Sequence, residues 1–261
     1  MSDSDTEHPN EAEIPRTKGP TRSYEREGST VRWDVTRGTS VAESLEAPPT
    51  ASPSLFGRDV EFDSVEEVLR KGGAMIVAGP AGIGKSTLLL EAKRAARDRG
   101  MTVLTATGVQ AETRLPYAGL HQLLRPVLHG TRRLPAPQRE ALATAFGETN
   151  GDPPSRFLVG LGTLNLLSDE AGEGGLLAIA EDAQWLDYGT GAVLGFVARR
   201  LGSDPLSLLV GIREGHESPL VDAGLSELRL DGLDGVSAGR LLDSFAPNLS
   251  PAVRARILKD A

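Results

Sequence analysis

The sequence predicts an α/β fold in which a parallel sheet of about five strands is covered by helices on both faces. Short apolar runs alternate with longer segments of helical periodicity, an order of elements typical of parallel sheets. Each apolar run is continuous instead of alternating with polar residues, which indicates burial on both faces of the strand. The expected strands are 74–78, 101–106, 176–180, 206–212 and a shorter one within 225–230.

Helices are predicted around these strands from apolar residues spaced three and four positions apart. The segment from Val60 to Lys71 has such a stripe, and Gly72 and Gly73 after it favour a helix end. The segment 117–146 is interrupted by prolines and is expected to be divided into shorter helices. The other expected helices are 86–99, 155–169 and 190–201.

Composition limits the possible functions of the chain. A net charge of −8 argues against a nucleic-acid-binding surface that covers the whole molecule. The absence of cysteine excludes disulfides, thiolate metal sites and cysteine catalysis. No apolar run approaches the length of about 18 residues that a membrane helix needs, and the N-terminus is acidic, unlike a secretory signal. We therefore expect a cytoplasmic protein with no membrane partner.

The N-terminal segment differs from the rest of the chain. Residues 1–53 are rich in Ser, Thr, Pro and charged side chains, acids outnumber bases, and apolar periodicity is nearly absent. Such a segment cannot bury enough apolar surface to offset the entropy lost on ordering. Residues 1–53 are therefore predicted to be a disordered acidic tail, and residues 54–230 to form the α/β core.

One motif predicts a phosphate-binding site. Residues Gly79 to Ser86 match the pattern G-x-x-x-x-G-K-[ST], with an apolar strand before them and a helical pattern after them. The glycines let backbone N–H groups point at phosphates, and the helix presents its positive end to them. Lys85 is expected to reach the β- and γ-phosphates of a nucleoside triphosphate, and Ser86 to bind Mg²⁺. The expected nucleotide-binding residues of this P-loop NTPase are Gly79, Pro80, Ala81, Gly82, Ile83, Gly84, Lys85, Ser86 and Thr87.

Two acids end the strand 176–180. Glu181 and Asp182 are expected at the carboxyl edge of the sheet, where open α/β sheets bind ligands. One acid would hold the metal through water, and the other would orient or deprotonate the attacking water. The alternative is that both acids begin a solvated loop.

Two arginines are further candidates for the same site. Arg213 ends the strand 206–212, where its guanidinium would sense the γ-phosphate or stabilise charge in the transition state. It would alternatively pair at the surface with Glu214 or Asp187. Arg58, just before the first helix, would contact the base or the phosphates, or would cap that helix.

With these motifs in place, the chain resembles the ATPase module of the large ATP-binding LuxR-type transcriptional regulators, which are signal-transduction ATPases related to AAA+ proteins. The resemblance covers about residues 55–261 and is most specific in the stretches around Leu120–Gln122 and Gln184–Asp187. The matching segments are Leu55–Asp59, Gly79–Ser86, Leu115–Leu124, Glu181–Asp187 and Arg229–Leu233. The second of these is the phosphate loop itself.

The resemblance implies roles for individual residues. It implies ATP as the nucleotide, Glu181 at the Mg²⁺-coordinating position and Asp182 at the water-activating position. The family usually has aspartate where this chain has Glu181, so the longer side chain changes metal geometry and hydrolysis rate. The resemblance also implies that residues 231–261 begin a C-terminal helical lid, and that the DNA-binding helix-turn-helix belongs to a domain absent from this chain, which would be a fragment or a truncated gene product.

The leading functional prediction is a regulatory ATPase that switches between states and associates with itself when ATP is bound. One alternative is a small-molecule phosphotransferase, in which Arg125, Arg132, Arg133 and Arg139 would belong to a lid. The Glu181–Asp182 pair and the helical insertion 117–169 favour the ATPase over this alternative. A second alternative is a scaffold that binds nucleotide without hydrolysing it.

Overall fold

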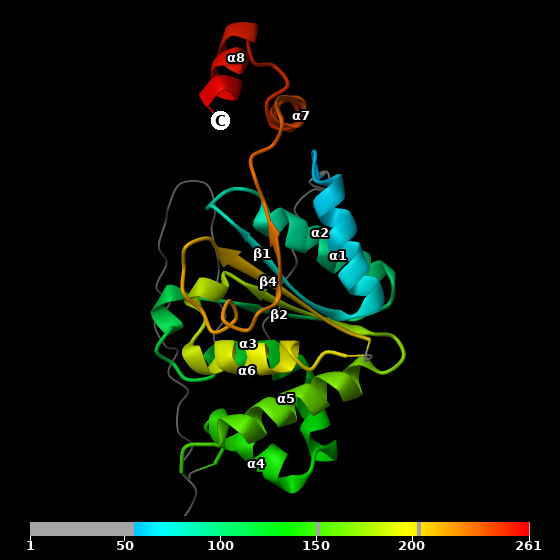
Figure 1. The fold of residues 1–261 in the computed structure, drawn as a ribbon, viewed down its shortest axis with the longest axis vertical. Helices are drawn as coiled ribbons and strands as arrows, with labels where there is room; N and C mark the ends of the chain where they lie inside the picture. The colour runs from blue at the N-terminus through cyan, green and yellow to red at the C-terminus, as the bar shows by residue number, and fades with distance from the viewer. Residues whose placement is uncertain (1–54, 150–151, 203–204, 261) are drawn as a thin grey trace, which may run out of the picture. The chain divides into compact units, whose positions relative to one another are not determined.

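A computed structural model describes residues 55–149, 152–202 and 205–260. The predicted disordered tail, residues 1–53, lies outside the described residues. Within the described part, a single parallel sheet is flanked by helices, as Figure 1 shows. The α/β P-loop NTPase fold predicted from the sequence is thereby confirmed.

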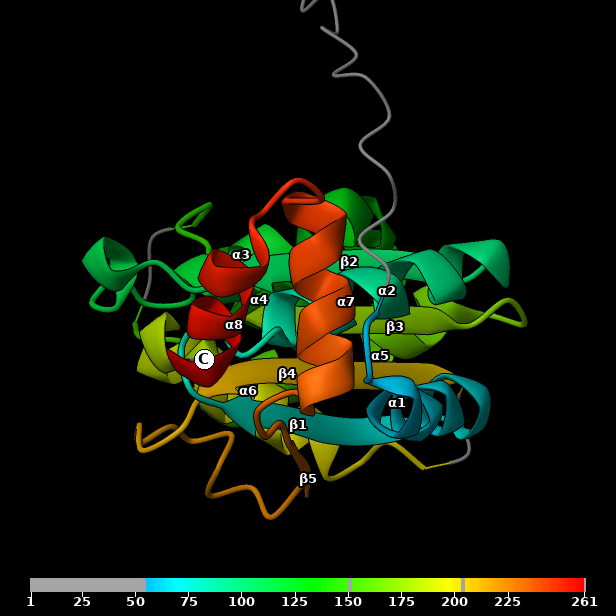
Figure 2. The same ribbon diagram turned by 90° about the horizontal axis from the view of Figure 1, so that it is seen from above.

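The sheet has five parallel strands in the order β2-β3-β4-β1-β5 (Figure 2). Because all strands run in the same direction, their carboxyl ends meet at one edge, where α/β sheets bind ligands. Strand β1 lies between β4 and β5, so the loop that follows β1 is next to the end of β4. The bounds are β1 Gly73–Gly79, β2 Thr102–Thr107, β3 Leu176–Glu181, β4 Leu206–Arg213 and β5 Ser226–Arg229.

The central strands β3 and β4 are apolar on both sides because helices cover both faces of the sheet. In β3, Ala178 and Ala180 pack into the core on one face, and Leu177 and Ile179 into the core on the other. Strand β4 is buried from Leu206 to Ile212, which explains its continuous apolar sequence.

Two helices cover one face of the sheet: α1 (Asp59–Lys71) and α2 (Lys85–Asp98) (Figure 1). Val65 and Leu69 of α1 are buried with Leu88, Leu89 and other residues of α2 against β1, β3 and β4. Helix α1 ends as predicted, since Gly72 after it adopts φ 77°.

The opposite face is covered by the insertion between β2 and β3 and by the helix after β3. The prolines divide the insertion, as expected, into α3 (Ala118–Leu124), η2 (Arg125–Arg133), α4 (Ala136–Ala145) and α5 (Arg156–Ala171). Helix α6 (Tyr188–Ala198) begins two residues before its predicted start. The cause is Asp187, whose carboxylate caps the helix by accepting a hydrogen bond from the Thr190 N–H at 2.9 Å.

The C-terminal residues form two further helices, α7 (Gly235–Phe245) and α8 (Pro251–Asp260), which follow β5 (Figure 1). The Asp234 carboxylate caps α7, because it accepts hydrogen bonds from the Val236 and Ser237 N–H groups at 2.8 and 2.9 Å. Two short 3₁₀ helices, η1 (Gln110–Glu112) and η3 (Ala183–Trp185), follow β2 and β3. Among the described residues, no helix has both the length and the hydropathy to cross a bilayer.

Candidate functional site

The phosphate loop joins the end of β1 to the start of α2. Its last glycine, Gly84, has φ 106° and lies directly before α2, in a conformation that side chains with a Cβ atom rarely adopt. Helix α2 has no side-chain cap and no acid in its first turn. Its first N–H groups and the positive end of its dipole are therefore available to an anion.

The Lys85 ammonium folds back over this loop. Its Nζ donates hydrogen bonds to the carbonyl oxygens of Gly79 at 2.9 Å and Pro80 at 2.7 Å. Burial lowers the pKa of Lys85, the nearby Arg213 guanidinium lowers it further, and the Asp182 carboxylate has the opposite effect. The ammonium thus lies at the same pocket as one cation, Arg213, and one anion, Asp182.

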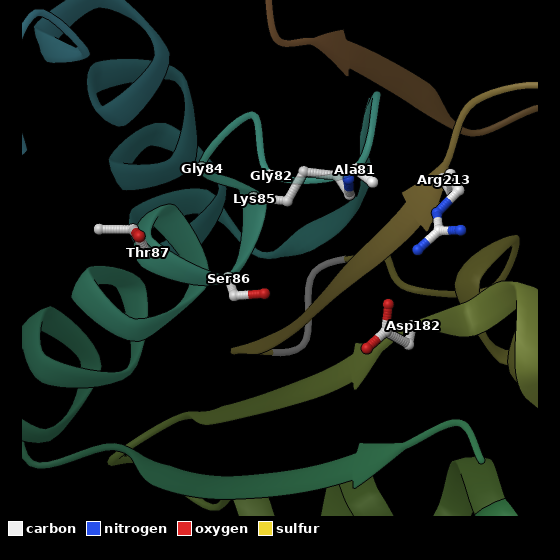
Figure 3. A pocket seen from close by; sticks show the side chains of 8 residues that line it. All are labelled: Ala81, Gly82, Gly84, Lys85, Ser86, Thr87, Asp182 and Arg213. Carbon is white, nitrogen blue, oxygen red and sulfur yellow. The ribbon is translucent and has the colours of Figure 1, made fainter. Parts of the chain in front are cut away.

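A pocket of about 230 Å³ opens beside the loop. Figure 3 shows the Asp182 carboxylate and the Arg213 guanidinium at the ends of neighbouring strands, across from Ser86. The pocket combines two cations, a helix N-terminus and one carboxylate, which is a chemistry suited to a phosphate group and a reacting water. It is lined by Ala81, Gly82, Gly84, Lys85, Ser86, Thr87, Asp182 and Arg213.

The remaining loop residues contribute through the backbone. The carbonyl oxygens of Gly79 and Pro80 accept from Lys85, and the carbonyl of Ile83 accepts from Arg58. None of these three residues lines the pocket, whereas the other residues named from the motif do.

Asp182 is held in an uncommon backbone conformation. Its φ is 48°, in the left-handed region that aspartate tolerates better than most residues. The turn is fixed by the Trp185 N–H, which donates to the Asp182 carbonyl at 2.8 Å. Gly108, at the end of β2, packs against this turn, because a Cβ atom there would lie 2.3 Å from the same carbonyl oxygen.

Gln184 connects Asp182 to β4. Its side-chain Nε2 donates to Asp182 Oδ1 at 3.0 Å, and its Oε1 accepts from the Arg213 backbone N–H at 3.0 Å. Gln184 lies in the segment Glu181–Asp187 that resembles the family, but its sequence position alone predicts no role for it. The only signal in the sequence for this contact is the position of Gln184, two residues after Asp182.

Glu181 does not line the pocket with Asp182. Its carboxylate forms an ion pair with Lys93 of α2, and both side chains are largely buried. The two acids diverge because β3 ends at Glu181, and Asp182 beyond it turns the chain with a left-handed φ of 48°. Glu181 is two positions after Ile179 and faces α2, whereas Asp182 lines the pocket.

Arg213 is the last residue of β4 and pairs with Gly79 in the β1–β4 register. The two alternative partners considered for it are engaged elsewhere. Glu214 forms an ion pair with Arg229 at 2.5 Å, and Asp187 is buried as the cap of α6. Among the described residues, no carboxylate forms an ion pair with Arg213, and its side chain lines the pocket.

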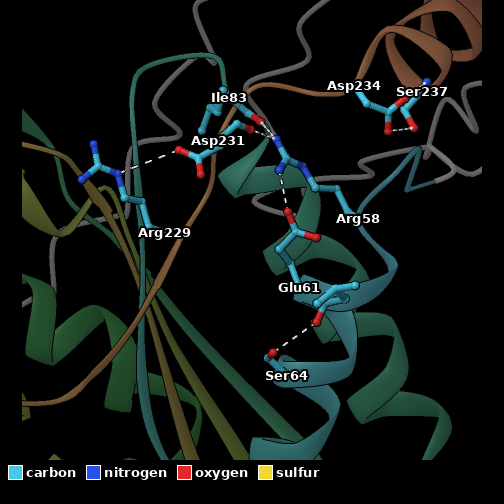
Figure 4. Close-up of polar contacts among 9 residues, drawn as sticks. Arg58, Glu61, Ser64, Ile83, Arg229, Asp231, Asp234 and Ser237 are labelled. Carbon is cyan, nitrogen blue, oxygen red and sulfur yellow. Dashed lines mark hydrogen bonds and ion pairs between the residues drawn. The ribbon is translucent and has the colours of Figure 1, made fainter.

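Arg58 contacts protein groups from three segments (Figure 4). Its guanidinium donates to Glu61 Oε1 at 2.6 Å, to the Ile83 carbonyl at 3.2 Å and to the Asp231 carbonyl at 2.5 Å. The residue is only 6% exposed and does not line the pocket. Its side chain therefore joins α1, the phosphate loop and the connection between β5 and α7.

The residues at the pocket fit a magnesium ion bound together with phosphates. Mg²⁺ prefers oxygen ligands and is usually held by one or two carboxylates, substrate phosphates and water. The Ser86 hydroxyl and the Asp182 carboxylate supply such oxygens at one pocket. The described residues contain no cluster of three or more His, Cys, Asp or Glu side chains that would hold a metal without a phosphate.

The fold and this site together define a P-loop NTPase. The chain belongs to the AAA ATPase domain family, whose model matches residues 54–210. The domain is thus of the AAA type that binds and hydrolyses ATP. No curated protein matches the sequence.

Solved structures with a similar fold come from several ATPases. A Walker-type ATPase from Pyrococcus abyssi is 16% identical with a TM-score of 0.50, over 78% of this chain and 63% of that chain. DnaA from Aquifex aeolicus bound to AMPPCP is 14% identical with a TM-score of 0.45, over 78% and 57% of the two chains. A STAND protein with a tetratricopeptide repeat sensor from Pyrococcus horikoshii is 16% identical with a TM-score of 0.45, over 76% and 27%. This chain therefore spans less than two thirds of each of these proteins.

Proposed function

We propose that this chain is the ATP-binding, slowly hydrolysing regulatory domain of a LuxR-type transcriptional regulator and acts as a nucleotide-dependent switch. The observation that carries the proposal is the meeting of Lys85, Ser86, Asp182 and Arg213 at one pocket. These residues come from three separate segments of the sequence. Their convergence supports a site built for a triphosphate and the water that attacks it.

Each residue has a proposed role that follows from its chemistry. Lys85 and the N–H groups at the start of α2 bind the phosphates, and Thr87 lies in the same first helical turn. Arg213 contacts the γ-phosphate and senses its loss. Asp182 orients the attacking water and accepts its proton. Mg²⁺ bound near Ser86 would neutralise phosphate charge.

Glu181 is proposed as the second acid of the metal site on the basis of the family resemblance. In the structure it is paired with Lys93. To reach a metal beside Ser86 it must leave that partner, so Lys93 is expected to modulate metal affinity.

Hydrolysis is tested by phosphate release from ATP with no acceptor present, which also separates an ATPase from a phosphotransferase. The arginines considered for an acceptor lid, residues 125, 132, 133 and 139, do not line the pocket. We expect slow release by the wild type and loss of release in Asp182→Asn, with ATP affinity retained. Asp222→Asn is the control, because Asp222 is exposed and does not line the pocket. Equal turnover by the Asp182 variant and the wild type would contradict the assigned role.

The switch is tested by the association state of the chain. We propose that ATP, and not ADP, favours self-association, and that DNA binding belongs to a further C-terminal domain. Sedimentation velocity with ATP, with ADP and without nucleotide measures the self-association of the chain. Identical sedimentation in all three conditions would count against the switch while leaving ATP binding intact.

A further inference from the structure

The backbone pairing between the parallel strands β3 and β4 stops before the ends of the two strands. Its last pair is Ala180 with Val210, although β3 continues to Glu181 and β4 to Arg213. Beyond that pair, the side chain of Gln184 spans the gap. Its Oε1 takes the place of a backbone carbonyl for the Arg213 N–H.

The direction of the Gln184 amide is determined by its partners. A backbone N–H only donates, so the atom facing Arg213 is the acceptor Oε1. The Nε2 group then faces Asp182, where it donates to Oδ1. A carboxylate only accepts when ionised, so both ends of the bridge are chemically matched. The amide cannot be turned round without losing both hydrogen bonds.

We infer that Gln184 is a positioning residue, which holds the Asp182 carboxylate at a fixed place relative to the end of β4. With Oδ1 held by the Gln184 amide, the carboxylate is oriented at the pocket that Ser86 and Arg213 also line. The inference rests on the proposed function, because it concerns the acid that orients the attacking water. It also links that acid to Arg213, the proposed sensor of the γ-phosphate.

Two substitutions, each with a side chain of nearly the same size as Gln, separate this role from a merely structural one. Gln184→Met removes both hydrogen bonds. Gln184→Glu keeps an acceptor for the Arg213 N–H but places a negative charge beside Asp182. If Gln184 positions the acid, both variants lose turnover by about tenfold or more, with ATP affinity unchanged. If Gln184 only fastens the end of β4, the neutral variant Gln184→Met speeds exchange of the Arg213 N–H but keeps the turnover of the wild type.

Gln122 supplies a matched control at the end of another strand. Its Oε1 accepts from the Thr107 backbone N–H at 3.0 Å, in the same way that Gln184 accepts from Arg213. Neither Gln122 nor Thr107 lines the pocket. Gln122→Met is therefore expected to keep turnover, although it removes an equivalent bond.

Amide hydrogen exchange tests the bridge without nucleotide. The Arg213 N–H is expected to exchange faster in Gln184→Met than in the wild type and to stay protected in Gln184→Glu. Unchanged exchange in Gln184→Met, or wild-type turnover in either variant, would overturn the inference. A wild type that releases no phosphate would contradict the proposed function instead, and Arg213 exchange would then still decide whether the bridge exists.

Discussion

The Asp187 carboxylate accepts a hydrogen bond from the Tyr117 backbone N–H at 2.8 Å and thereby joins two segments that lie 70 positions apart. It also accepts from the Gly119 N–H at 3.3 Å and from the N–H and hydroxyl of Thr190. Asp187 is 3% exposed, so these donors have no access to water as a replacement. The Asp187 side chain, five residues after Asp182 in the sequence, thus fixes the starts of α3 and α6.

Asp187→Ala is expected to lower the free energy of unfolding by about 3 kcal/mol. Removal of the acceptor leaves buried donors unpaired, which costs more than a hydrogen bond contributes. Urea unfolding measures the change, with Asp222→Ala, at an exposed aspartate, as the control. A loss no larger than that of the control would contradict the role of Asp187 as a buried acceptor.

Arg58→Met is expected to loosen the connection between β5 and α7. The substitution keeps an apolar stem but removes the hydrogen bonds to the Ile83 and Asp231 carbonyl oxygens. Hydrogen exchange without nucleotide should therefore speed up in residues 231–245. Arg97→Met, at an exposed arginine of α2, is the control. Unchanged exchange together with weaker ATP binding would instead indicate that Arg58 contacts the nucleotide.

Lys93→Met is expected to make Glu181 available to a metal ion. A partly exposed ion pair contributes about 1 kcal/mol, so its removal should lower the Mg²⁺ concentration for half-maximal turnover about fivefold. Lys71→Met is the control, because Lys71 pairs with Glu67 on an exposed face of α1. If Mg²⁺ titrations of the Lys93 variant and the control coincide, Glu181 does not serve the metal.

ATP affinity is expected to fall at alkaline pH. The pKa of Lys85 is lowered by burial and by Arg213. Lys85 therefore loses its charge at a lower pH than an ordinary lysine, whose pKa is about 10.4. Bound phosphates favour the charged form, so ATP binding takes up protons in that range. Calorimetry across pH measures the effect, and residual binding by Lys85→Arg should show no such fall. Constant affinity up to the ordinary lysine range would count against this role.

Much of the fold could be predicted because it depends on local patterns. Continuous apolar runs indicated buried parallel strands, and the phosphate loop motif located the turn from β1 into α2. The strand order could not be predicted in the same way, since it depends on which helices cover which face. The cap of α6 is not predicted from the sequence, because Asp187 is expected there as an alternative surface partner of Arg213.

The candidate site was predicted less completely than the fold. Lys85, Asp182 and Arg213 line one pocket beside the carboxyl ends of β3 and β4, since parallel strands end at one edge. The sequence predicts Glu181 and Asp182 as a pair, but β3 ends between them and the left-handed turn at Asp182 separates their side chains. The bridge through Gln184 depends on side-chain conformations that no spacing rule encodes.

The most direct test of the account is calorimetric titration of the wild type and Lys85→Ala with ATP and Mg²⁺. The Lys85 ammonium lies at the phosphate loop, where it donates hydrogen bonds to the Gly79 and Pro80 carbonyl oxygens. Removal of a charged partner of a bound phosphate costs about 3 kcal/mol of binding free energy, or roughly a hundredfold in affinity. Lys71→Ala, an exposed lysine of α1, should bind ATP like the wild type. We expect at least that hundredfold loss in Lys85→Ala alone, and wild-type affinity in that variant would contradict nucleotide binding at this loop.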